Sequence, residues 1–177
     1  MQIGYTIEKN TLILISLLKA HGIKKIIASP GTTNVSFVIS LQNDPFFEVF
    51  SAVDERAAAF MACGMAEETG EAVVLSCTGA TASRNYIPGL TEAYYKKLPV
   101  LAVTSTQHTG KAGSYSAQFI DRSQQFTDMV KLSVQSDVVF TKEAEEFQVN
   151  AINNAILELF HNEPGPVHIN LRILRYC

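Results

Sequence analysis

Short apolar runs alternate with helix-like segments along most of this chain, and this alternation constrains its fold more than any other feature. Residues 72–77 (AVVLSC) and 99–104 (PVLAVT) are almost uninterrupted apolar runs, which is typical of strands covered on both faces. Strands that are joined through helices form parallel sheets between helix layers. We therefore predict an α/β fold, a three-layer sandwich with a mostly parallel central sheet between helices.

The individual elements follow from apolar periodicity and from helix start and stop signals. Asp54 is expected to cap a helix that Gly70 ends. The sequence predicts helices over 6–21, 33–42, 55–69, 81–95 and 143–160, and strands over 24–28, 46–52, 72–77, 99–104, 131–135, 138–140 and 166–171. Residues 106–130 are polar and receive no assignment.

Composition and charge argue against several classes of protein. The 177 residues carry a net charge of −3, so neither nucleic acid nor an anionic membrane surface is an expected partner. The three cysteines lack C-x-x-C spacing and the four histidines lack metal-ligand spacing, so neither a disulfide framework nor a metal site is expected. Without a secretory signal or a membrane-spanning run, we expect the protein in the cytoplasm.

Three turns carry the residues that could form a site. In a parallel sheet, ligands bind beyond the carboxyl ends of the strands. Residues 29–32 (SPGT) follow the first expected strand, Asp54 and Glu55 follow the second, and residues 78–80 (TGA) follow the third. Their convergence predicts a ligand site at that edge of the sheet.

Each of these features also has a purely structural interpretation. Glu55 could be a first-turn acid that favours the helix dipole, or a carboxylate that faces a ligand. Residues 29–32 could be a simple strand-to-helix turn with Thr32 or Thr33 as the N-cap. A single glycine in 78–80 is a weak phosphate-loop signal, and neither nucleotide-binding glycine motif is present.

Together and in this order, the turns resemble the thiamine-diphosphate enzymes typified by acetolactate synthase. The stretch IIASPGTTN is similar to the family's strand and Pro-Gly loop, and VDERAAAFMACGMAEETG to the helix that carries its glutamate. AVVLSCTGATASRNYIPGLTEAYYKKLPVLAVTS and EPGPVHINL are similar to later strands of the family's N-terminal pyrimidine-binding domain. The resemblance covers essentially the whole chain.

The resemblance implies a role for each matching residue. Glu55 falls on the family's glutamate, which hydrogen-bonds the aminopyrimidine ring of thiamine diphosphate and activates the cofactor for attack on a 2-oxo acid. The implied cofactor-binding residues are Pro30, Glu55, Thr78, Gly79 and Asn85, and the implied substrate-facing residues are Gly31, Thr32 and Gln118. The reaction would be a decarboxylation or a carboligation.

The family binds magnesium and the diphosphate through a G-D-G motif that this sequence lacks. The resemblance therefore implies a partner diphosphate-binding domain, and a homodimer or homotetramer. We expect a pyrimidine-binding domain over residues 1–171, with 172–177 beginning a linker. Alternatives are a small subunit of a two-gene enzyme such as sulfopyruvate decarboxylase, a non-catalytic regulatory copy, and an unrelated α/β small-molecule binder.

Within the family, the motifs are most similar to a menaquinone-pathway branch that adds a decarboxylated 2-oxoglutarate unit to isochorismate. That branch is expected to carry an arginine where this chain has Thr33, and another where it has Thr106-Gln107. Threonine and glutamine cannot form a bidentate clamp on a carboxylate. We therefore expect a different or smaller 2-oxo acid as substrate.

Overall fold

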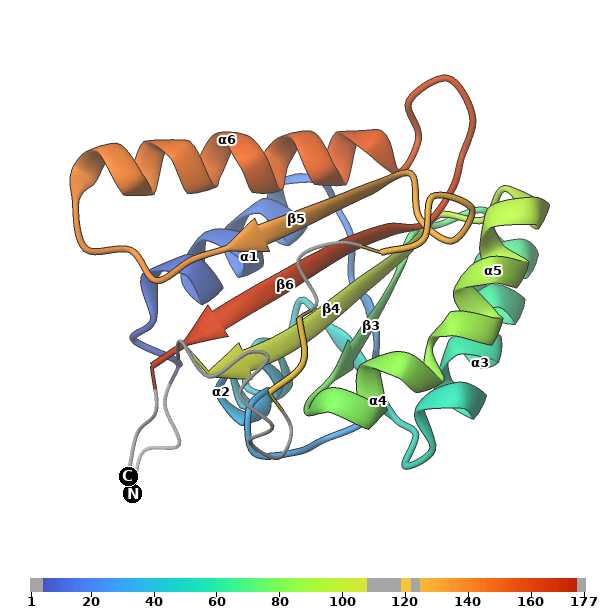
Figure 1. Cartoon of the computed structure of the whole chain (residues 1–177), viewed down its shortest axis with the longest axis horizontal. Coiled ribbons are helices and arrows are strands. Elements are labelled where there is room, and N and C mark those ends of the chain that lie inside the picture. The colour runs from blue at the N-terminus through green and yellow to red at the C-terminus, as the bar shows by residue number, and fades with distance from the viewer. Residues whose placement is uncertain (1–4, 108–118, 122–124, 175–177) are drawn as a thin grey trace.

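A computed structural model of the protein describes residues 5–107, 119–121 and 125–174 (Figure 1). Its helices are α1 (Lys9–Ala20), α2 (Val35–Gln42), α3 (Glu55–Thr69), α4 (Ala80–Asn85), α5 (Ile87–Lys96) and α6 (Lys142–Glu158). Its strands are β1 (Lys25–Ala28), β2 (Glu48–Ser51), β3 (Val73–Cys77), β4 (Val100–Gln107), β5 (Leu132–Ser136) and β6 (Val167–Ile173).

The strands form one sheet in the order β2-β1-β3-β4-β6-β5, and each described pairing is parallel. β3 and β4 lie in the middle, and every residue of β3 is buried, as the apolar run 72–77 predicted. Since all strands point the same way, their carboxyl ends share one edge of the sheet (Figure 1). The predicted α/β fold is confirmed.

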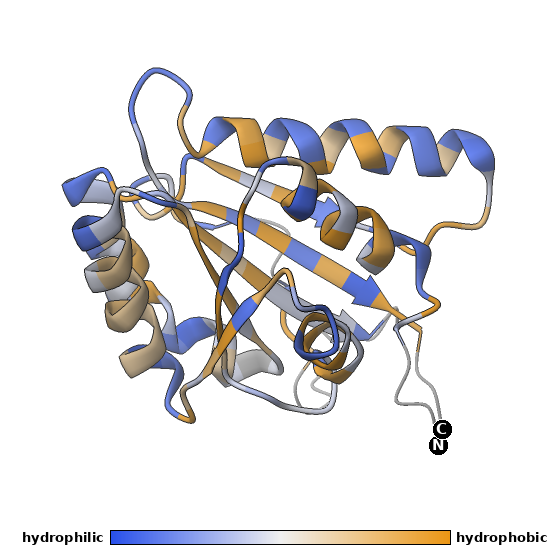
Figure 2. Cartoon of the chain, turned by 180° about the vertical axis from the view of Figure 1, so that it is seen from behind, coloured by the Kyte–Doolittle hydropathy of each residue, from blue (hydrophilic) through white to orange (hydrophobic). Residues whose placement is uncertain are grey.

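Two apolar cores fill the space between the sheet and its helices. One core joins α1, α2 and α6 to one face of the sheet, and the other joins α3, α4 and α5 to the opposite face (Figure 1). Along β6 the sequence VHINLRI alternates hydrophobic and hydrophilic residues, which Figure 2 shows as alternating bands. Its apolar side chains join the first core, whereas His168 and Asn170 face the other way and bond to Thr104 of β4.

Local signals account for the helix boundaries that were predicted correctly. Asp54 caps α3 by accepting a 2.8 Å hydrogen bond from the Ala57 amide. Gly70 ends the same helix with a φ of 67°, a left-handed conformation that glycine adopts without strain. No helix in the described part of the chain combines the length and apolarity that crossing a membrane requires.

Several expectations about the elements were wrong, among them the end of β4, which runs to Gln107 and not to residue 104. The helix predicted over 81–95 is two helices, α4 and α5, which meet at Tyr86 because Pro88 has no amide hydrogen to continue the α4 ladder. Residues 138–140 form no strand, since the chain leaves β5 after Ser136 and enters α6. β6 continues through Ile173, two residues beyond the expected end.

Candidate functional site

The candidate site lies at the carboxyl edge of β2, β1 and β3, which are neighbours in the sheet. The turn after β1, the start of α3 after β2, and the turn after β3 therefore emerge side by side. This arrangement brings together the three segments that the sequence singled out. The sheet order that produces it could not be read from the sequence.

Asn34 holds the loop after β1 in place. Its side chain is 0% exposed, and its Oδ1 accepts a 2.8 Å hydrogen bond from the Gly31 amide. Its Nδ2 donates to the Ser29 carbonyl at 3.2 Å and to Ser76 Oγ of β3 at 3.0 Å. A buried amide that is satisfied on both sides fixes the loop against β3. Ser29 Oγ donates to the Ala52 carbonyl at 2.7 Å, which ties the same loop to the chain before α3.

Glu55 is the first residue of α3 and is half-buried at the site's edge. The next turn contributes Ala58 and Ala59, which are fully buried. A Cβ placed on Gly89 of α5 would lie only 2.4 Å from the Ala59 Cβ, so α3 and α5 pack almost backbone to backbone. Cys63 Sγ also donates to the Gly89 carbonyl at 3.2 Å. Close packing against α5 therefore fixes the position of Glu55.

Tyr86 lies at the junction of α4 and α5, and only 1% of it is exposed. Burial raises the pKa of the Tyr86 phenol well above its usual value, with nearby Cys77 and the charge of Glu55 adding to the shift. Ser29 is close enough to act in the opposite direction. The buried phenol thus stays neutral.

The turn after β3 is shaped by Thr78 and Gly79. Gly79 has a φ of 61° and a ψ of 177°, a conformation essentially restricted to glycine. A Cβ on Gly31 would lie 2.0 Å from Thr78 Cγ2, so the Thr78 methyl packs directly on the Gly31 backbone. The turns after β1 and β3 are thus in contact.

Neither Thr32 nor Thr33 caps α2, although the sequence suggested one of them. The residue before α2 is Asn34, whose side chain makes no capping bond, and Thr33 bonds instead to Thr78 and Ser105. The Thr33 side chain therefore lies at the junction of the strand ends and does not cap α2.

The remaining predicted residues vary in their exposure. Pro30 and Thr32 are exposed on the loop after β1, and Gly31 is half-buried. Asn85 is exposed at the last position of α4. Gln118 lies outside the described residues.

Reasoning from the sequence missed three residues of this region, namely Thr33, Asn34 and Tyr86. Each of them interacts with at least one segment that is distant in the sequence. The one local signal was Pro88, which indicates a helix boundary just where Tyr86 is buried.

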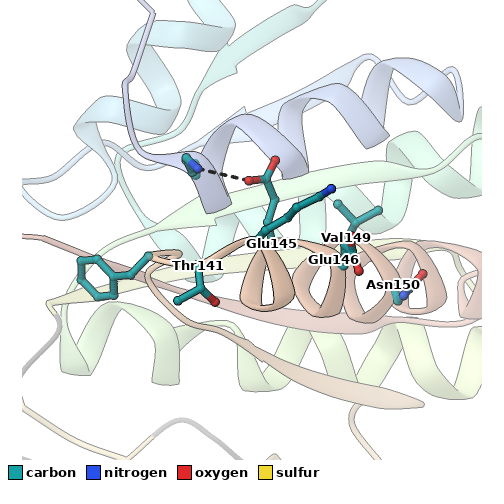
Figure 3. Close-up of a pocket in the computed structure, with 8 residues that line it drawn as sticks. Thr141, Glu145, Glu146, Val149 and Asn150 are labelled. Carbon is teal, nitrogen blue, oxygen red and sulfur yellow. Dashed lines mark hydrogen bonds and ion pairs between the residues drawn. The ribbon is translucent and has the colours of Figure 1, made fainter.

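A separate hollow of about 710 Å³ lies between the N-terminal ends of α1 and α6 (Figure 3). Its walls include Phe140, Thr141 and Val149, and the ion pair between Lys9 and Glu145, at 3.1 Å, crosses it. It lies toward the β5 end of the sheet, with β4 and β6 between it and the candidate site. None of the residues predicted for the site lines it.

Comparison with known proteins defines the class. Residues 10–130 match the family model described as thiamine pyrophosphate enzyme, N-terminal TPP binding domain. The chain therefore belongs to the N-terminal domains of thiamine-pyrophosphate enzymes, the family that the turns resembled.

Several similar relatives are named 2-succinyl-5-enolpyruvyl-6-hydroxy-3-cyclohexene-1-carboxylate synthase. The protein from Phocaeicola vulgatus is 38% identical over 169 residues, 96% of this chain. That from Bacteroides thetaiotaomicron is 36% identical over 96% of this chain, and that from Porphyromonas gingivalis 33% identical over 97%. The chain spans about 30% of the length of each of these relatives.

The residues at the site suit the pyrimidine end of thiamine diphosphate. An aminopyrimidine needs hydrogen-bonding partners for its ring nitrogens and amino group, together with a close, flat contact surface. Glu55 supplies a half-buried carboxylate, and Gly31 and Gly79 add no side chain of their own to the two turns. The carboxylate and the glycine-containing turns therefore fit the group that the family binds.

Proposed function

We propose that this domain holds the aminopyrimidine ring of thiamine diphosphate, and that Glu55 is the acid that activates the cofactor. The main support for this proposal is the position of Glu55, at the start of α3 and beside the turns after β1 and β3. Pro30, Thr78, Gly79 and Asn85 are the proposed cofactor contacts, and Gly31, Thr32 and Gln118 the proposed substrate contacts.

When bound, the cofactor supplies an electron sink for cleaving the bond next to the carbonyl of a 2-oxo acid. This chain holds the ring in place, and its Glu55 carboxyl exchanges a proton with a ring nitrogen. Ala58 and Ala59 exclude water behind the first turn of α3. A proton held in a partly dry site is transferred with less solvent reorganisation than one in bulk water.

We propose a 2-oxo acid as substrate, decarboxylated or joined to an acceptor. Two observations bear on its identity. The relatives are named as synthases of a cyclohexene carboxylate. In this chain the side chain of Thr33 is uncharged and turned toward Thr78 and Ser105, so it does not supply a cation for a second carboxylate.

The active site would be completed by a diphosphate-binding domain that also holds magnesium, from the same or another chain. In support, exposed apolar side chains lie near Glu55, just before α3 and in its second turn. Val53, just before the helix, is 89% exposed, and Phe60 and Met61 in α3 are 47% and 43% exposed. An exposed apolar surface of this kind marks an interaction site. We propose that the partner domain covers it in a homodimer or homotetramer.

The extent of the domain, from residue 1 through Ile173 where β6 ends, with a linker after it instead of from 172 as expected, is likewise a proposal. A cytoplasmic location is a proposal as well. It is supported by the expected substrate, which is a small metabolic acid.

The test is Glu55→Gln in the full-length protein, assayed for turnover of a panel of 2-oxo acids with thiamine diphosphate and magnesium. Removal of a general acid should lower kcat by about a hundredfold or more. Glu68→Gln makes the same change at an exposed position near the other end of α3 and should leave kcat unchanged. Turnover within about twofold of the wild type in Glu55→Gln, with cofactor bound, would rule out the role.

A further inference from the structure

Thr33 joins three strand ends at the candidate site. Its amide donates a 3.1 Å hydrogen bond to Thr78 Oγ1, in the turn after β3. Its hydroxyl donates to the Ser105 carbonyl of β4 at 2.9 Å and is also hydrogen-bonded to the Thr78 hydroxyl. We call this set, Thr33, Thr78 and Ser105, the Thr33 bridge.

Counting protons shows how the bridge orients Thr78. The single hydroxyl proton of Thr33 goes to the Ser105 carbonyl, which can only accept. The hydrogen bond between the two hydroxyls must therefore use the proton of Thr78, with Thr33 Oγ1 as acceptor. Thr78 Oγ1 thus donates its one proton to Thr33 Oγ1 and also accepts from the Thr33 amide, so its proton is used inside the protein.

The Thr78 methyl group is fixed as well. It packs on Gly31, where any side chain would collide with Thr78 Cγ2 at 2.0 Å. With its hydroxyl held by Thr33 and its methyl held by Gly31, the side chain has a single orientation. The Thr78–Gly79 turn therefore offers a ligand its backbone groups and not the Thr78 hydroxyl.

We propose that Thr33 is a positioning residue for the cofactor. It acts by holding Thr78, and so sets the place of the Thr78–Gly79 turn that meets the pyrimidine ring. This inference rests on the proposed function. Asn34 anchors the same loop to Ser76 independently, so the loop can keep its course when the Thr33 bridge is removed.

The experiment compares three variants of the full-length protein. Thr33→Val keeps the shape of the side chain and removes both hydrogen bonds of Thr33 Oγ1, whereas Thr33→Ser keeps the hydroxyl. Thr91→Val is the matched control, because Thr91 is also half-buried but its hydroxyl bonds only to Ile87 of its own helix, at 2.8 Å. The dissociation constant of thiamine diphosphate with magnesium is measured by titration calorimetry. Amide hydrogen exchange of the Thr78–Gly79 turn is followed without cofactor.

Thr33→Val should weaken cofactor binding by about tenfold, the equivalent of one to two lost neutral hydrogen bonds. Exchange at the Thr78–Gly79 turn should accelerate in the same variant. Thr33→Ser should restore both values to within about twofold of the wild type, and Thr91→Val should change neither. Restoration by serine separates the hydroxyl from a general loss of packing.

The positioning role is overturned if Thr33→Val binds cofactor and exchanges like the wild type, or if Thr33→Ser is as impaired as Thr33→Val. If the wild type binds no thiamine diphosphate, the proposed function itself fails. Hydrogen exchange then still tests whether Thr33 holds the Thr78–Gly79 turn. Unchanged exchange in Thr33→Val would refute this structural role too.

Discussion

Replacing Gly89 by alanine should destabilise the protein, although alanine is the better helix former. The new Cβ would lie 2.4 Å from the Ala59 Cβ and 2.9 Å from the Ala59 backbone carbon. Carbon atoms make favourable contact at about 3.5 Å or more, so α5 would have to move away from α3 by roughly 1 Å. The Ala59 backbone cannot move aside as the end of a flexible side chain could.

Overpacking of this kind costs about 1–3 kcal/mol. The gain in helix propensity offsets about 0.5–1 kcal/mol of that cost. We therefore expect Gly89→Ala to lower the free energy of unfolding by about 1–2 kcal/mol, which for a domain of this size lowers Tm by roughly 2–8 °C. Urea and thermal unfolding followed by circular dichroism measure both quantities.

The matched control is Gly64→Ala. Gly64 is also helical, in α3, and a Cβ there would meet nothing within 4 Å. This variant should gain about 0.5–1 kcal/mol. The same substitution should thus lower the free energy of unfolding at Gly89 and raise it at Gly64. A Gly89→Ala variant as stable as Gly64→Ala would refute the close packing of α3 on α5.

Two further predictions concern buried polar groups. Asn34→Ala removes the hydrogen bonds to Gly31, Ser29 and Ser76, and should cost about 2–4 kcal/mol in urea unfolding; a loss below about 0.5 kcal/mol would show that the loop does not depend on them. The Lys19 ammonium and the Tyr5 hydroxyl lower the pKa of Asp44 to about 2 from its usual 3.8. Because this pKa is depressed in the folded state, the stabilisation is complete above about pH 4 and is lost as the pH falls toward 2. As the pH falls from about 4 to about 2, the free energy of unfolding should therefore decrease less in Asp44→Asn than in the wild type. Equal decreases in the two proteins would contradict the lowered pKa of Asp44.

The fold class was predictable because its signals are local. The central strand β3 is buried on both faces, so its residues are apolar without interruption. α3 carries its own start and stop in Asp54 and Gly70. The break at Tyr86 also had a local signal in Pro88, which the helical pattern of 81–95 concealed.

The candidate site was predictable only in part. The turns after β1, β2 and β3 could be placed at one edge of the sheet because parallel strands share that edge. Which turns touch depends on the order of the strands, and that order is set by packing across the whole domain. For this reason the sequence suggested a helix cap for Thr33, whereas the structure shows it joining β1, β3 and β4.

The central claim is that Glu55 activates thiamine diphosphate, and one measurement tests it without knowledge of the substrate. The full-length protein, loaded with thiamine diphosphate and magnesium, is transferred into deuterium oxide, and loss of the acidic proton of the thiazolium ring is followed by quenched-flow NMR. We predict exchange slowed by about a hundredfold or more in Glu55→Gln, and unchanged in Glu68→Gln. Exchange at the wild-type rate in a Glu55→Gln protein that still binds the cofactor would contradict the account.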